Sequence, residues 1–258
     1  MGFDLGGAAQ SFYRSLTMAD FTTHLSTSSA VGVVYGASGY LHWQMDPATC
    51  LIGAALCGLA GMLPDVDSDS GRSQREIMTF AAAVIPMLML HRFDDMQLTH
   101  EQTAVAAGCV YILVRFGFGE LFRRYTVHRG MFHSLPAALV AGLTTSLVCS
   151  CDDTSMRFFK VTAVVLGYMI HLMLDELWAI EWYRGRLRLK NSFGTAMKLV
   201  GNRWFPNVVT YGVLLAVGSL AFQDPALVRY FSPTRDAPLH DTIAETLHTH
   251  DVGTTLTR

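Results

Sequence analysis

Charge is scarce in this sequence of 258 residues, because Lys, Arg, Asp and Glu make up 16% of it, against about 25% in ordinary soluble domains. The net charge of -2 provides no basic field for phosphate backbones, so we expect no nucleic-acid partner. The five cysteines lack the CxxC and Cys/His spacings of zinc modules. Residues 1–20 lack the pattern of a cleavable signal peptide. What remains is apolar: hydrophobic residues are 51% of the chain.

Apolar runs recur along the chain, at about 26–43, 48–63, 77–90, 103–119, 132–150, 161–180 and 207–223. Because they lack period-2 alternation, they predict helices rather than strands. A membrane-crossing helix needs about 20 apolar residues, a length that the fifth and sixth runs reach clearly and the second, third and seventh do not. We predict an all-α fold, a polytopic membrane helical bundle of about seven (roughly six to eight) membrane-embedded helices. A soluble all-α bundle is the alternative.

The chain is expected to form one membrane-embedded domain over 1–223, followed by a polar, poorly ordered tail over 224–258. Within the domain, the loop 183–206 interleaves basic and apolar residues, which is typical of a membrane interface with anionic headgroups. Its RLRLK stretch alternates and predicts a short strand. Most Lys and Arg residues fall on the side of the amino terminus, which the positive-inside rule places in the cytoplasm. A site for an anionic substrate would produce the same asymmetry.

Histidines and aspartates occur where the apolar runs begin or end. They are His24 before the first run, Asp65 and Asp67 after the second, His128 and His133 before the fifth, and His171 and Asp175 in the last half of the sixth. If each run crosses the membrane, odd-numbered runs begin on the same side on which even-numbered runs end. These side chains are therefore predicted to converge at one interface, on the cytoplasmic side.

Imidazole together with carboxylate is a donor set that suits zinc, manganese or iron. His171 and Asp175, four residues apart, share one helix face, and an aspartate inside an apolar helix is costly unless it is paired or metal-bound. Asp65 and Asp67 are expected to point into the same site from an extended turn, where two carboxylates need a cation or a shared proton. We predict a divalent-metal centre, with zinc as the first candidate and with enough ligands for two ions.

Each of these motifs also has a simpler interpretation. His24 alone is typical of an interfacial or capping histidine, and DVDSDSG of a solvated acidic turn or, without the terminal Glu, of a partial calcium loop. The two histidines before the fifth run could be structural, and His171 could pair with Asp175 alone. Arg129 is a candidate for clamping a phosphate through two hydrogen bonds or for snorkelling to the interface. Ser134 is expected to cap the fifth helix.

Taken together, His24 before a glycine-rich run and the motifs LPDVD, HRGMFHSL and GYMIHLMLDEL resemble the YdjM-type family of membrane-bound, metal-dependent hydrolases of bacterial and archaeal inner membranes. The matching pieces extend over about residues 22–178. The family usually has Thr where Phe132 stands, which argues against a hydroxyl role there. The family is similar, at a distance, to zinc-dependent phospholipases C and single-strand nucleases, which cleave phosphoesters with His/Asp clusters. The resemblance therefore implies a hydrolase.

We therefore expect an integral inner-membrane hydrolase that cleaves a phosphoester, one belonging to a membrane lipid. The expected metal ligands are His24, Asp65, Asp67, His128, His133, His171 and Asp175. Asp67 or Asp65 is the candidate general base, and Arg129 would contact the phosphate. The alternative is a divalent-metal transporter or sensor, which would place polar ligands along a path through the membrane. A structural membrane protein, whose polar residues only connect its helices, is a third interpretation.

Overall fold

The computed structural model describes residues 21–67, 71–120, 131–149, 153–183, 186–189, 194, 197–225 and 227–228. The chain divides into two compact units, Met1–Ala221 and Phe222–Arg258, and the helices and strands below lie almost wholly in the first. His128 and Arg129 lie outside the described residues, and only the backbone of Asp67 is described. The predicted roles of these three residues, like the predicted domain boundary and tail, stay predictions.

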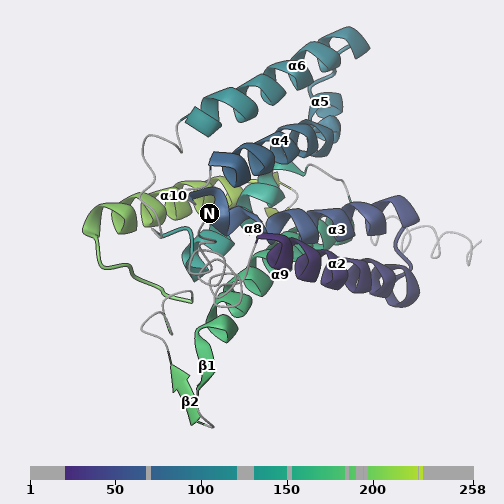
Figure 1. Ribbon diagram of the computed structural model, residues 1–258. Helices are drawn as coiled ribbons and strands as arrows, with labels where there is room; N and C mark the ends of the chain where they lie inside the picture. The colour runs from purple at the N-terminus through teal and green to yellow at the C-terminus, as the bar shows by residue number, and fades with distance from the viewer. Residues whose placement is uncertain are drawn as a thin grey trace, which may run out of the picture. The chain divides into compact units, whose positions relative to one another are not determined.

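The described chain is almost entirely helical (Figure 1). Its helices are α2 (Phe21–Trp43), α3 (Pro47–Ala60), η1 (Leu63–Asp67), α4 (Gly71–Leu88), α5 (Leu90–Asp95), α6 (His100–Ile112), η2 (Leu113–Phe118), α8 (Leu135–Val148), α9 (Thr154–Trp178) and α10 (Trp204–Phe222). Each predicted apolar run lies on one helix or on two consecutive helices, which confirms the all-α class. One hairpin is added, in which β1 (Ile180–Tyr183) pairs antiparallel with β2 (Arg186–Leu189), the strand predicted from RLRLK.

Among the described residues, α9 and α10 are long and apolar enough to cross a membrane. The apolar helices α3 and α8 have 14 residues each, which corresponds to a rise of about 21 Å. That is shorter than the hydrocarbon core of a bilayer, about 30 Å. The count of about seven crossing helices therefore stays a prediction.

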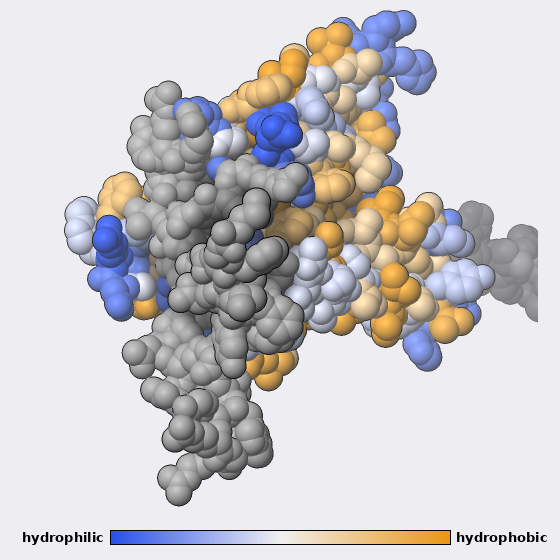
Figure 2. Space-filling model, in the orientation of Figure 1, coloured by the Kyte–Doolittle hydropathy of each residue, from blue (hydrophilic) through white to orange (hydrophobic). Residues whose placement is uncertain are grey.

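Large apolar side chains are exposed on most helices. Examples are Val33 of α2, Leu51 of α3, Phe80 of α4 and Val105 of α6, and Figure 2 shows apolar surface over these elements. Helix α10 is the extreme case, because Ala221 is its only buried residue among those described. Exposed apolar surface of this extent is typical of a molecule whose helices contact lipid or other protein.

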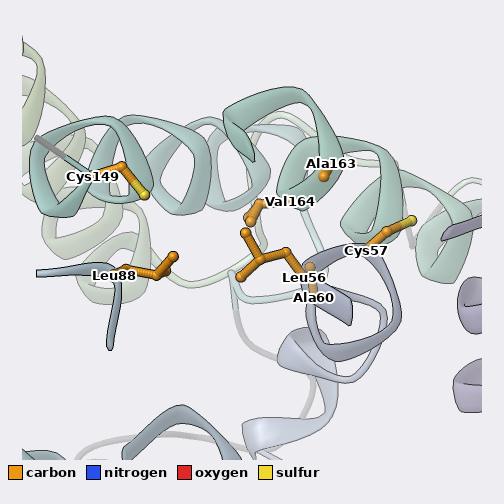
Figure 3. Packing of buried hydrophobic residues seen from close by; sticks show 7 residues of the cluster. All are labelled: Leu56, Cys57, Ala60, Leu88, Cys149, Ala163 and Val164. Atoms are coloured by element: carbon orange, nitrogen blue, oxygen red, sulfur yellow. The ribbon is translucent and has the colours of Figure 1, made fainter. Parts of the chain in front are cut away.

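The helices that carry the predicted site residues pack against one another. Helix α3 contacts α2 and α9, and α8 contacts α9. The core between them contains Leu56, Cys57 and Ala60 of α3 and Ala163 and Val164 of α9, together with Leu88 and Cys149 (Figure 3). The backbones of α3 and α9 approach so closely at Gly167 that a Cβ atom there would lie 2.0 Å from the carbonyl oxygen of Cys57. Glycine thus sets the spacing of these two helices.

A second group of helices packs beside α3. Helix α4 contacts α6 and the π-helix η2, and Ala81, Ala82 and Val114 form the small apolar cluster between them. Helix α4 also contacts η1, where Ile77 and Met78 bury Met62 and Val66. This contact fixes the 3₁₀ turn that carries Asp65.

Candidate metal centre

The turn that carries Asp65 follows directly from the local sequence. Helix α3 ends at Gly61, and the next residues, LPDVD, form the 3₁₀ helix η1. Pro64 is compatible with the first turn of a helix because its missing N–H would have no partner there. Val66 is buried against α4, and Asp65 is half-buried. The extended turn that we expected at Asp65 and Asp67 is wrong, because the segment is helical.

His133 is held by hydrogen bonds on both sides of it. Ser134 caps α8, as predicted, by accepting a hydrogen bond from the Ala137 amide at 3.4 Å. Its hydroxyl donates to the carbonyl of Met131, and the buried Tyr168 of α9 donates from its hydroxyl to the carbonyl of Phe132. These bonds fix the residues before α8 against α9, so that His133 faces the last turns of that helix.

His171 is the most completely enclosed of the predicted ligands, with no exposed surface. Its Nδ1 lies 2.7 Å from the carbonyl oxygen of Gly61. Because a carbonyl can only accept, Nδ1 carries the proton in the neutral imidazole, and Nε2 keeps its lone pair. Among the described residues Nε2 has no hydrogen-bond partner. Metal-binding histidines are commonly oriented in this way: one ring nitrogen donates to a carbonyl, and the other, here Nε2, can bind the ion.

Carboxylate oxygens of Asp65 and Asp175 both approach the Nε2 atoms of His133 and His171. Asp65 Oδ1 lies 3.8 Å from His133 Nε2 and 3.8 Å from His171 Nε2. Asp175 Oδ2 lies 3.5 Å from His133 Nε2 and 3.6 Å from His171 Nε2. Tetrahedral zinc with bonds of about 2.0–2.1 Å separates its ligands by about 3.3 Å. The four carboxylate-to-imidazole separations exceed that value by only a few tenths of an ångström, so each carboxylate could share an ion with these imidazoles after a small contraction.

His24 reaches the same cluster from α2, but from the other side of Asp175. Its Nε2 lies 3.3 Å from Asp175 Oδ1, and its ring stacks on that of His171 with 3.8 Å between centroids. The side chain is buried, and Nδ1 has no hydrogen-bond partner among the described residues. His24 is thus placed either to hold Asp175 in orientation or to bind a second ion at Oδ1.

The segment that contains the cluster matches a known protein family. A family model described as YdjM inner membrane protein matches residues 18–185, which is more than half of the chain and includes the whole cluster. The chain belongs to the YdjM inner membrane protein family. No match was found among curated proteins, and none among solved structures. Membership of the YdjM family makes the chain an inner membrane protein, and it confirms the family resemblance that the motifs indicated.

Gly61, Ser28 and Tyr168, which were given no role from the sequence, also shape the centre. Gly61 supplies the carbonyl that orients His171, and the buried Ser28 lies against it, since a Cβ atom on Gly61 would be 2.0 Å from Ser28 Oγ. Tyr168 fixes the residues next to His133. The position of Tyr168, three residues before His171, was a usable signal, because such residues share a helix face. A backbone carbonyl leaves no signal in a sequence.

In this YdjM-family chain, the cluster can hold a divalent cation. The donors form two groups, and within each group the donor atoms lie within 4.8 Å of one another. One group consists of His24, Asp65 and His171, the other of His133, His171 and Asp175. Because His171 is common to both, they describe neighbouring parts of one centre. Buried imidazole nitrogens without hydrogen-bond partners are costly unless something binds them. Two carboxylates beside the same imidazoles favour a cation as the occupant.

Proposed function

We propose that the protein is an integral membrane, metal-dependent hydrolase that cleaves a phosphoester of a membrane lipid. The observation that carries the proposal is the convergence of imidazoles and carboxylates from α2, η1, the start of α8 and the end of α9. Segments separated by up to about 150 residues supply these side chains, yet their donor atoms lie within a few ångströms of one another.

The described residues support the following roles. Asp65, His133, His171 and Asp175 would hold one ion, for which zinc is the first candidate. A divalent ion there would polarise a phosphoryl oxygen and lower the pKa of a bound water. A second ion would draw on His24 and the Oδ1 atom of Asp175, with the predicted ligands Asp67 and His128. Arg129 stays the predicted phosphate contact, and Asp65 or Asp67 the predicted general base.

The position of the cluster favours a fixed site over a path for ions. Its donors gather at the last turns of α9, whereas Arg157 and Lys160 are buried near the start of the same helix. Lys160 is eleven residues from His171, about 17 Å along the helix. Buried cations would repel a divalent ion moving past them. In the proposed topology the helices cross the membrane several times and the cluster faces the cytoplasm.

The direct test compares two Asp→Asn variants of the full-length protein purified in detergent. Asp65→Asn is expected to lower the rate of phospholipid hydrolysis by at least about 100-fold, because it removes one anionic donor from the cluster. Asp94→Asn, which changes an exposed carboxylate on α5, is expected to leave the rate unchanged. The assay measures release of phosphorylated or dephosphorylated headgroup from a panel of phospholipids.

Two outcomes would contradict the proposal. One is a wild-type protein that binds metal but hydrolyses no member of the panel, together with zinc or manganese uptake into proteoliposomes, which would favour the transporter. The other is an Asp65→Asn variant as active as wild type, which would place any hydrolysis elsewhere in the molecule.

Metal removal is expected to destabilise the protein. An ion bound to the folded state alone stabilises it by about 2.7 kcal/mol when its free concentration is 100 times its Kd. Treatment with a chelator should therefore lower the thermal midpoint in detergent, and excess zinc should restore it. His24 and His171 both contribute to the cluster, so the double variant His24→Ala/His171→Ala should no longer respond to zinc. An equal response in that variant would show that the stabilising ion binds elsewhere.

A further inference from the structure

Residues 197–205 (MKLVGNRWF), here called the bridging segment, carry an unusual number of exposed apolar side chains. Met197, Leu199 and Val200 are 39%, 59% and 63% exposed, and Trp204 and Phe205 are 75% and 53% exposed. Arg203 between them is exposed as well. The segment thus presents a mixed apolar and basic surface rather than a packed one.

The bridging segment and the residue Gly194 before it are attached to the residues next to two of the candidate ligands. The Leu135 amide donates to the carbonyl of Lys198 at 3.3 Å. Lys198 and Ser134, the neighbour of His133, thereby form a parallel β-bridge between their backbones. The Gly194 amide donates to Glu176 Oε2 at 2.7 Å, and Glu176 is the neighbour of Asp175. Lys198 and Gly194 are therefore anchored on the α8 and the α9 side of the candidate metal centre, respectively.

The other end of the bridging segment is fixed to α10. The amide and carbonyl of Gly201 form a reciprocal pair with the side chain of Asn207, at 2.8 Å each. Tyr211 of α10 donates from its hydroxyl to the carbonyl of Leu199 at 2.9 Å. Helix α10 begins at Trp204, is long and apolar enough to cross a membrane, and is almost unburied. The segment is thus continuous with a helix suited to lipid.

From these contacts we propose that the bridging segment lies in the bilayer surface and forms the edge over which a lipid headgroup reaches the His/Asp cluster. Trp204 stands where tryptophan is enriched, at the end of a membrane helix, and Arg203 suits anionic headgroups. Met197, Leu199 and Val200 would contact acyl chains while the phosphoester lies over His133 and Asp175. The entry role rests on the proposed hydrolase function, whereas the membrane contact does not.

The membrane contact is tested without any activity measurement. Wild type and Trp204→Phe are reconstituted into vesicles of phosphatidylcholine and phosphatidylglycerol, with bromine placed either near the headgroup or at the end of the acyl chains. The difference between their fluorescence isolates Trp204, which should lose most of its emission to shallow bromine and much less to deep bromine. Emission that bromine does not change would overturn the proposal, and cross-linking between two copies at the segment would identify protein as its occupant.

The entry role is tested by the ratio of two hydrolysis rates, one for phospholipid in vesicles and one for the water-soluble bis(p-nitrophenyl) phosphate. In Leu199→Ser/Val200→Ser this ratio is expected to fall by about tenfold, because two apolar contacts with acyl chains are lost. Metal content should stay at the wild-type level, and Val105→Ser, on exposed α6, should keep the wild-type ratio. An unchanged ratio in an active enzyme would overturn the inference alone, whereas a wild type that hydrolyses neither compound would overturn the proposed function.

Discussion

Replacement of His171 by alanine is expected to lower the affinity of the protein for zinc by more than about 100-fold, because the loss of an outer partner of a ligand alone costs about 10–100-fold. His171 is shared by both donor groups of the cluster, and its Nε2 has no hydrogen-bond partner among the described residues. No other side chain in the cluster combines these two properties. The affinity is measured by titration against a competing chelator, with the full-length protein in detergent.

His42→Ala is the matched control for this variant. His42 lies at the end of α2 and is exposed. The same substitution of histidine by alanine should therefore leave zinc affinity unchanged at this position. If His171→Ala retained the wild-type affinity, the cluster would be an ordinary set of ion pairs within the bundle. Equal losses in both variants would instead indicate zinc bound non-specifically by surface histidines.

Substitution of Gly167 by alanine is expected to have the largest effect on stability. The added Cβ atom would lie 2.0 Å from the carbonyl oxygen of Cys57, and a backbone atom cannot move aside as a side-chain end can. Overpacking of this kind costs about 1–3 kcal/mol, and we expect a value at the upper end. Because Gly167 is one turn before His171, separation of α3 and α9 should also draw His171 away from Gly61 and weaken zinc binding.

The control is Gly108→Ala on α6, where no described atom outside the neighbouring turns of the same helix lies within 4 Å of the new methyl group. Alanine in a helix at an unhindered position is neutral or stabilises by about 0.4–1 kcal/mol. Thermal midpoints in detergent should therefore fall for the α9 variant and stay or rise for the α6 variant. Wild-type stability in Gly167→Ala would mean that α3 and α9 do not approach as closely as described.

The helices and the convergence of five candidate ligands could be predicted from the sequence. If successive runs alternate in direction, the start of an odd run lies beside the end of an even run, so His24, Asp65, His133, His171 and Asp175 were predicted to meet although long stretches of chain separate them. The structure brings these side chains together. This convergence requires only that successive helices alternate in direction, whatever their length.

Other features depend on tertiary contacts and could not be predicted in the same way. Hydropathy alone does not distinguish the 3₁₀ turn at Asp65 from an extended one, because its conformation depends on burial of Val66 against α4. The hydrogen bond from His171 to Gly61 involves a backbone atom. The basic loop was predicted to be interfacial, yet its attachment beside His133 and Asp175 depends on its backbone: the Lys198 carbonyl accepts from the Leu135 amide, and the Gly194 amide donates to the Glu176 carboxylate.

The most direct test of the central claim is a structure of the zinc-loaded protein with anomalous scattering recorded at the zinc edge. We predict a peak within about 2.0–2.2 Å of His133 Nε2, His171 Nε2, Asp65 Oδ1 and Asp175 Oδ2. A second peak beside Asp175 Oδ1 and His24 would establish two ions. A protein that has no peak among these side chains at saturating zinc, or whose zinc lies elsewhere, would contradict the account.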